Sequence, residues 1–135
     1  MRSYLLAALL FVPVLAAAEP PPPPPETPET IAQLNKDAES LQQQIKASPK
    51  DAELRVKLGF TYMRLRRHDD AQRCFEEAVQ LDPKKAVAHY MLGMIYEKKG
   101  MKDKALAAWK ACLENTQDPS MKDTASRHIH HLSRP

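Results

Sequence analysis

Two short phrases in this chain are nearly identical and lie 34 residues apart. They read Leu58-Gly59-x-x-Tyr62 and Leu92-Gly93-x-x-Tyr96, so two of the chain's three glycines occupy the same place in a period. The same offset relates four further pairs of residues: Ala52 and Ala86, Asp69 and Asp103, Ala71 and Ala105, and Phe75 and Trp109. A fixed period of this length is typical of a protein built from stacked copies of one small structural unit.

The apolar residues after residue 29 follow a helical pattern. They recur three and four positions apart, which is the spacing of one buried helix face. We expect a first helix over 30–48 with Thr30 as its N-cap, a helix over 51–66, and a last helix over 120–133. Side-chain carboxylates should cap two further helices, one at Asp69 or Asp70 and the other at Asp103. The helix between those two should begin near Ala86 and end at Gly100.

The period and the residues that recur with it resemble the tetratricopeptide repeat, a helix-turn-helix unit that stacks on its neighbours. The resemblance implies an all-α fold, a right-handed superhelical stack with full repeats over 51–84 and 85–118. The first helix then resembles the second half of a repeat, and the last helix closes the other end of the stack. Gly59 and Gly93 let the two helices of a repeat approach closely, with Phe75 and Trp109 beside them. Arg66 departs from the pattern, since it stands where the first repeat would have a turn glycine.

The resemblance also implies where a partner binds. In this family, residues on the first helix of each repeat that point away from the second helix line a concave groove. Carried over by position, the groove residues are Val56, Lys57, Phe60, Met63, Arg64, Tyr90, Met91, Met94, Glu97 and Lys98. The alternative is that several of them pack between the repeats or against the flanking helices. The Lys and Asn clamp of chaperone-binding members is absent, because Val56 and Phe60 occupy its positions.

The function that this resemblance implies is a protein-protein interaction adaptor or scaffold for a protein or peptide partner. Bacterial periplasmic members of the family often serve envelope assembly. We expect no enzyme activity and no cofactor, because the chain has no Gly-x-Ser-x-Gly elbow and no glycine-rich phosphate loop. Two other functions stay open. One is a scaffold that self-associates into a homo-oligomer through the same apolar strip, and the other is a metal-binding protein that uses His128 and His131, which share a helix face.

The first 18 residues have the three parts of a secretory signal peptide. Arg2 supplies a positive charge, residues 4–15 form a short apolar stretch, and Ala16-Ala17-Ala18 offers a cleavage site. The apolar stretch is shorter than the roughly 20 residues that span a bilayer, so we expect no stable membrane insertion after cleavage. This interpretation predicts a mature chain that begins at Glu19 and is exported, either periplasmic or secreted. An uncleaved membrane anchor is the alternative.

Residues 19–29 form a linker that contains seven of the chain's twelve prolines. Proline fixes φ and lacks an N–H donor, so we expect an extended polyproline II rod. Six consecutive prolines span roughly 19 Å at about 3.1 Å per residue. The simplest interpretation is a spacer, and the alternative is a docking ligand for an aromatic-lined groove.

The net charge argues against a nucleic-acid partner, and the positions of the two cysteines argue against a disulfide within the chain. Removal of Arg2 with the signal peptide would change the formal net charge from +3 to +2. We expect no nucleic-acid partner, because proteins that bind nucleic acid usually carry a clustered basic face. Cys74 and Cys112 fall on the second helices of neighbouring repeats, about one turn out of step, which disfavours a disulfide within the chain. Cys112 should be buried. Cys74 should be more exposed, which leaves pairing between two chains open.

Overall fold

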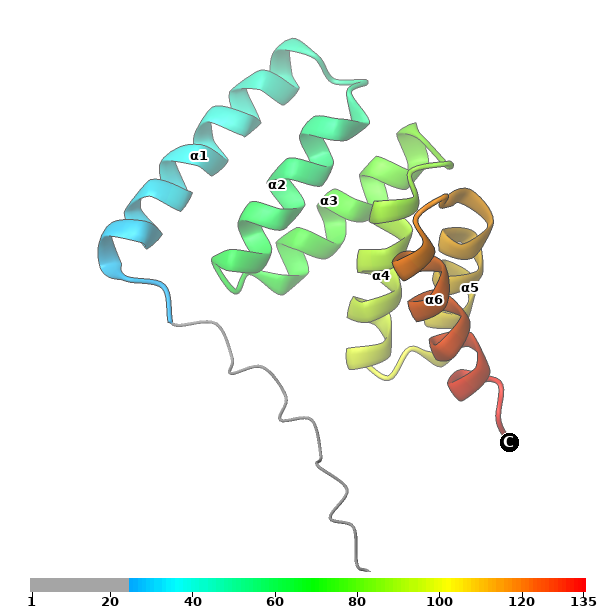
Figure 1. The fold of residues 1–135 in the computed structure, drawn as a ribbon. Helices are drawn as coiled ribbons and strands as arrows, with labels where there is room; N and C mark the ends of the chain where they lie inside the picture. The colour runs from blue at the N-terminus through cyan, green and yellow to red at the C-terminus, as the bar shows by residue number, and fades with distance from the viewer. Residues whose placement is uncertain (1–24) are drawn as a thin grey trace, which may run out of the picture.

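Six α helices follow one another through residues 25–135, the part of the chain that this computed structural model describes. They are α1 (Pro28–Ala47), α2 (Ala52–Arg64), α3 (His68–Leu81), α4 (Ala86–Lys98), α5 (Lys102–Asn115) and α6 (Pro119–Leu132). Each helix packs against the next in chain order (Figure 1). The predicted all-α architecture of helix-turn-helix pairs is confirmed. The predicted signal peptide and the linker up to residue 24 lie outside the described residues.

The two helices of each repeat approach closely at a glycine. A Cβ atom built on Gly59 would lie 2.7 Å from Cζ of Phe75, and one built on Gly93 would lie 2.7 Å from Cδ2 of Trp109. Both aromatic side chains are fully buried. Each ring therefore fills the space that a glycine leaves on the facing helix, as the sequence predicts.

The turn inside each repeat depends on one residue with positive φ. Arg66 has φ 57° and Gly100, its equivalent one period later, has φ 71°. Around Arg66, the N–H of Arg67 donates to the Tyr62 carbonyl at 2.9 Å and the N–H of Arg66 donates to the Met63 carbonyl at 3.0 Å. The same two hydrogen bonds recur around Gly100. This is the Schellman arrangement, in which the left-handed residue is usually glycine.

Replacing Arg66 with glycine should therefore stabilise the protein. A non-glycine residue in the left-handed region costs roughly 1–2 kcal/mol, and the greater freedom of glycine in the unfolded chain offsets part of that gain. We expect the free energy of unfolding to rise by up to about 1 kcal/mol, measured by urea denaturation. Gly100→Ala is the matched control and should have the opposite sign. A loss of stability in Arg66→Gly would contradict this account of the turn.

Three helix starts differ from the prediction. Thr27 rather than Thr30 caps α1, with its hydroxyl accepting from the Thr30 N–H at 3.2 Å, and Pro28 is already helical. α3 and α5 begin before the predicted aspartates and have no side-chain cap hydrogen bond. The physical reason is the turn, which leads directly into the next helix. Asp69, Asp70 and Asp103 lie in the first helical turn instead, where a carboxylate still favours the helix dipole.

Neighbouring repeats are joined by a hydrogen bond that recurs with the period. Gln42 Nε2 donates to the Tyr62 hydroxyl at 2.6 Å, and the Tyr96 hydroxyl donates to Glu76 Oε1 at 2.6 Å. Gln42 and Glu76 occupy equivalent positions, as do Tyr62 and Tyr96. α1 therefore contacts α2 in the way that α3 contacts α4. The prediction that the first helix resembles the second helix of a repeat is confirmed by this equivalence.

The Tyr96 hydroxyl should make stability fall at high pH. Burial, and then the hydrogen bond to Glu76, raise the pKa of Tyr96 well above its ordinary value of 10.0. Because the unfolded chain loses this proton first, the stabilisation is complete below pH 10 and is lost above it. We expect a smaller fall in the free energy of unfolding between about pH 8 and about pH 11 for Tyr96→Phe than for wild type. Tyr90→Phe is the control, and an equal fall in wild type and Tyr96→Phe would contradict the assignment.

The two end helices have polar outer faces. The positions of α1 that are equivalent to the buried Ala71, Phe75 and Ala78 are Asp37, Leu41 and Gln44, of which Asp37 and Gln44 are exposed. α6 places Met121, Ala125, Ile129 and Leu132 against the core, as the sequence predicts. Both helices therefore end the stack, since neither offers an apolar face for another repeat.

Candidate functional site

The exposed part of the predicted groove lies on α2 and α4. Phe60 and Met94, which are one period apart, are 39% and 46% exposed. Arg64 and Lys98 are likewise one period apart and exposed, and Lys57 lies one turn before Phe60. Because equivalent positions of stacked repeats face the same side, these side chains share one surface. We call it the α2–α4 face: Lys57, Phe60, Arg64, Met94 and Lys98.

The core holds the Phe60 side chain of this face in place. The Phe60 ring meets Phe75 edge to face, with centroids 5.4 Å apart and planes at 79°. Phe75 in turn fills the space beside Gly59. Phe60 thus has one side packed on the core and the other open to solvent. An apolar side chain that is fixed on one side costs less conformational entropy when a partner binds it.

The other predicted groove residues are less accessible. Val56 is only 3% exposed and belongs to the core, so its assignment to the groove is wrong. Met63, Tyr90 and Met91 are half-buried and pack against the core. The Tyr90 ring meets Trp109 edge to face at 5.1 Å. In so short an array the neighbouring helices cover much of α2 and α4.

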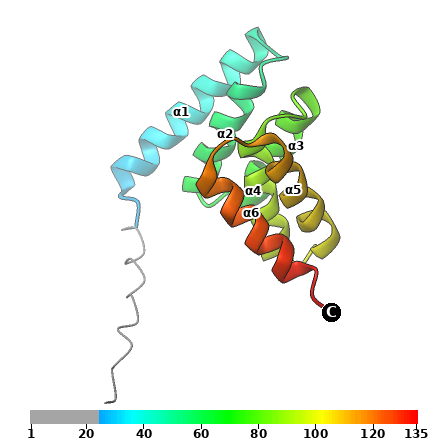
Figure 2. The same cartoon turned by 45° about the vertical axis from the view of Figure 1, so that its right-hand side comes forward.

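Glu97, the last of these residues, is already engaged within the chain. Its Oε2 accepts from Trp109 Nε1 at 3.1 Å and lies 2.7 Å from Nδ1 of His128. The His128 ring stacks on Trp109, with centroids 4.4 Å apart and planes at 16°. These contacts hold α6 against α4 and α5, beside which it lies in the turned view (Figure 2). Glu97 is therefore not free to contact a partner.

The same contacts give His128 a structural role. Its ring is held between Trp109 and Glu97, while His131 is exposed. A metal site needs three or four ligands that converge. Within residues 25–135, no group of three or more His, Cys, Asp or Glu side chains is arranged to hold a metal ion.

The α2–α4 face is basic. Lys57, Arg64 and Lys98 are exposed, and the one carboxylate predicted beside them, Glu97, is turned to Trp109 and His128. Arg64 has a partner from the segment before α1: its Nη2 lies 2.9 Å from Glu26 Oε1. A pattern in the sequence could not have revealed this pair, because 38 residues separate its members and no repeat relates them.

Beside the α2–α4 face, the start of α1 and the end of α2 enclose a cleft of about 460 Å³. Its apolar lining includes Ile31, which is 42% exposed. Two residues of the predicted groove, Met63 and Arg64, also line it. The remaining lining residues are Pro25, Glu26, Leu65, Arg66 and His68.

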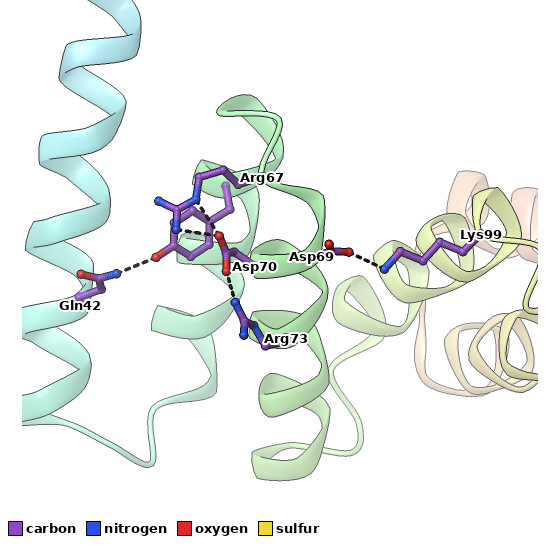
Figure 3. A network of polar contacts seen from close by, with 7 residues as sticks. Gln42, Arg67, Asp69, Asp70, Arg73 and Lys99 are labelled. Atoms are coloured by element: carbon purple, nitrogen blue, oxygen red, sulfur yellow. Dashed lines mark hydrogen bonds and ion pairs between the residues drawn. The ribbon is translucent and has the colours of Figure 1, made fainter.

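A second cleft, of about 480 Å³, crosses α1, α2 and α3, and two of its charged lining residues, Asp70 and Arg73, pair with each other. Asp70 accepts from Arg67 at 2.7 Å and also pairs with Arg73 (Figure 3). The Arg67 guanidinium lies over the Tyr62 ring, 4.5 Å from its centroid. One residue earlier on α3, Asp69 pairs with Lys99 at 2.7 Å. Of these contacts, Asp69–Lys99 joins neighbouring repeats. The ion pairs of Asp70 and the contact of Arg67 with Tyr62 lie within one repeat.

Neither cysteine is placed for chemistry. Cys74 and Cys112 are both free and buried, and Cys74 is the more exposed of the two, as expected, at 7% against 0%. Burial, and then the nearby carboxylates of Glu77 and Asp70, raise the pKa of the Cys74 thiol to about 11. Burial also raises the pKa of Cys112. Both thiols therefore stay protonated at neutral pH, and the thiolate is the reactive form.

The fold and this face define a helical-repeat protein in which the first helices of the repeats expose one face to solvent. A family model of the tetratricopeptide repeat matches residues 50–118, about half of the chain. The chain belongs to the tetratricopeptide-repeat family, whose members are generally scaffolds for protein-protein interaction and typically non-catalytic. No curated protein matches the chain. Within residues 25–135, no helix has both the length and the apolar character that a bilayer crossing requires.

Proposed function

We propose that this chain is an exported adaptor that binds a segment of a partner protein on its α2–α4 face. The observation that carries the proposal is the pair Phe60 and Met94, two large apolar side chains exposed at the same place in successive repeats. Aromatic residues and methionine are enriched at protein interfaces and tolerate different partner shapes. The partner segment therefore has two apolar anchors, one for each repeat.

The charges on the face define the partner further. Lys57, Arg64 and Lys98 surround the two apolar side chains. A partner segment that carries acidic residues beside its apolar anchors matches this pattern, and complementary charge mainly speeds association and selects among partners. An amphipathic helix and an extended peptide both offer such a pattern. The partner is thus an acidic, amphipathic protein segment, for which assembly of the cell envelope is one setting.

A photo-reactive amino acid at residue 94 tests the face in the cell. In the compartment where the chain resides, we expect it to cross-link to a defined partner. The same reactive group at Leu81, which is as exposed as Phe60 but lies on α3, is the control. The partner's band should be lost when Phe60→Ala is added. A band that survives Phe60→Ala, or that appears equally at residue 81, would contradict the proposed face.

A second copy of this chain is the other occupant that the exposed apolar pair allows. End-to-end stacking is disfavoured, because α1 and α6 have polar outer faces. Self-association through the α2–α4 face would use Phe60 and Met94 themselves. The same cross-linking experiment distinguishes the two cases by mass, since a band of twice the chain's mass would identify a homodimer and replace the adaptor proposal.

The export part of the proposal rests on residues 1–18. A positive residue, a short apolar stretch and three alanines follow one another there in the order of a signal peptide. Expression of the full chain, followed by fractionation and N-terminal sequencing, tests it. We expect a mature protein that begins at Glu19 and lies outside the cytoplasm. A chain that retains residues 1–18 in the membrane fraction would identify an anchor instead.

A further inference from the structure

The cleft between the start of α1 and the end of α2 is an apolar surface that the described helices leave open. Its volume of about 460 Å³ falls within the range of about 300–1,000 Å³ that is usual for ligand pockets. Ile31, Met63 and Leu65 supply its apolar side chains, together with Pro25. Because the side chain of Ile31 is 42% exposed, apolar area in this cleft is available to another molecule.

The charged and titratable residues that line the cleft are mostly basic. Arg64 and Arg66 each contribute an exposed guanidinium group, and His68 contributes an imidazole. Glu26 is the only carboxylate among the described residues that line it. An apolar surface beside an excess of guanidinium groups favours a ligand that combines an apolar group with a negative charge.

Glu26 shows where such a negative charge binds. Nε of Arg64 donates to Glu26 Oε1 at 3.0 Å, and Nη2 of Arg64 lies 2.9 Å from the same oxygen. Paired N–H donors of one arginine give a carboxylate a well-defined position. Arg64 is exposed and Glu26 is only half-buried, and exposed ion pairs contribute little to stability. A carboxylate of another molecule can therefore replace Glu26 at Arg64.

The cleft is continuous with the α2–α4 face. Arg64 belongs to both, and Phe60 lies one turn before Arg64 on α2. Met63, the residue next to Arg64, also lines the cleft. A protein segment that contacts Phe60 can therefore place a further residue in the cleft. Because Ile31 and the two arginines are exposed, the cleft suits a residue presented by such a segment better than a small molecule, which a pocket usually buries by 70–90%.

We propose that this cleft binds one apolar residue and a neighbouring acidic residue of the partner segment. The apolar side chain contacts Ile31 and Met63, and the carboxylate replaces Glu26 at Arg64. The partner thus has a third apolar anchor besides the two on the α2–α4 face, and its acidic residue has a defined place. That the residue pair belongs to a partner protein rests on the proposed function, whereas the affinity of the cleft for such a pair does not.

Titration with a short peptide tests the cleft without any partner. The probe is the N-acetylated, C-amidated dipeptide leucyl-glutamate, added to the full chain with labelled isoleucine and methionine methyl groups. We expect saturable shifts of the Ile31 and Met63 signals, while Ile129 on α6 is unaffected. Leucyl-glutamine, which lacks the charge, should bind about fivefold more weakly, and glycyl-glutamate, which lacks the apolar side chain, about tenfold more weakly. Equal affinity for the three peptides, or no shift at Ile31, would overturn the proposal.

Two substitutions should change the affinity for leucyl-glutamate in opposite directions. Arg64→Gln removes the partner of the carboxylate and should weaken binding about fivefold, whereas Glu26→Gln removes the competing carboxylate and should strengthen binding about two- to fivefold. Neither side chain is buried, so the fold should be retained, which circular dichroism checks. Arg73→Gln, which removes an exposed arginine of α3 outside this cleft, is the matched control and should bind as wild type does. Unchanged or weaker binding in Glu26→Gln would overturn the replacement of Glu26 by the ligand.

The peptide titration and the cross-linking at residue 94 fail independently. If residue 94 cross-links to a partner but the peptide does not bind, the cleft proposal is wrong and the adaptor proposal stands. If the peptide binds but residue 94 finds no partner, the cleft keeps its ligand chemistry and the assignment of that ligand to a partner on the α2–α4 face is wrong.

Discussion

Replacing Trp109 with alanine is expected to lower the free energy of unfolding by about 3–5 kcal/mol, the usual cost of removing a large buried aromatic side chain. Trp109 is fully buried, fills the space beside Gly93 and donates a hydrogen bond to Glu97. It also supports the stacked ring of His128. Its loss therefore weakens the second repeat and detaches α6. Small domains have only about 5–15 kcal/mol of stability, so this loss removes a large part of it.

Guanidinium denaturation followed by circular dichroism measures this effect, since the variant loses the chain's only tryptophan. Leu81→Ala is the control, because Leu81 is 39% exposed and should change stability far less. A loss below about 1 kcal/mol for Trp109→Ala would mean that Trp109 does not hold α4, α5 and α6 together.

The second large effect is expected at the glycines of the repeat phrase. In Gly93→Ala the new Cβ would lie 2.7 Å from two ring atoms of Trp109, which is buried and has nowhere to move. We expect a loss of about 1–3 kcal/mol from this overpacking. Helix propensity alone predicts the opposite sign, because alanine is favoured over glycine in a helix by about 1 kcal/mol. The sign of the measured change in the free energy of unfolding therefore decides between packing and propensity.

A double-mutant cycle isolates the contribution of the contact between residue 93 and the Trp109 ring. Trp109→Phe replaces the indole with a smaller ring, so Gly93→Ala should cost less in that background than in wild type. Gly59→Ala provides a second case, because its Cβ would lie 2.7 Å from Phe75. Equal costs of Gly93→Ala in both backgrounds would show that contact with Trp109 is not the cause.

The period carried most of the fold information. It placed Gly59 against Phe75 and Gly93 against Trp109, and it related α1 to the second helix of a repeat. The first residues of α3 and α5 were harder to predict from the sequence. Asp69, Asp70 and Asp103 were predicted to be N-caps, although the preceding turn leads into each helix without a side-chain cap. That turn is set by backbone geometry at Arg66 and Gly100, and only the equivalence with Gly100, not the arginine itself, points to the positive φ of Arg66.

The candidate site was predictable only in part. The register brought Phe60 and Met94 to equivalent positions, but it could not show that Val56 is buried, because burial depends on how closely the flanking helices pack. The contacts of His128 with Glu97 and Trp109 join residues that no period relates. The pair Glu26–Arg64 likewise depends on the path of the chain before α1, which has no counterpart in the repeat.

The binding face is tested most directly by the affinity with which the chain binds the purified partner that cross-linking identifies. By isothermal titration calorimetry, the double variant Phe60→Ala, Met94→Ala should bind at least about 30-fold more weakly than wild type, which corresponds to about 2 kcal/mol for two interface anchors. Circular dichroism should show unchanged helicity, and Leu81→Ala should bind within about twofold of wild type. Wild-type affinity in the double variant, or an equal loss in Leu81→Ala, would contradict the assignment of the α2–α4 face as the partner-binding surface.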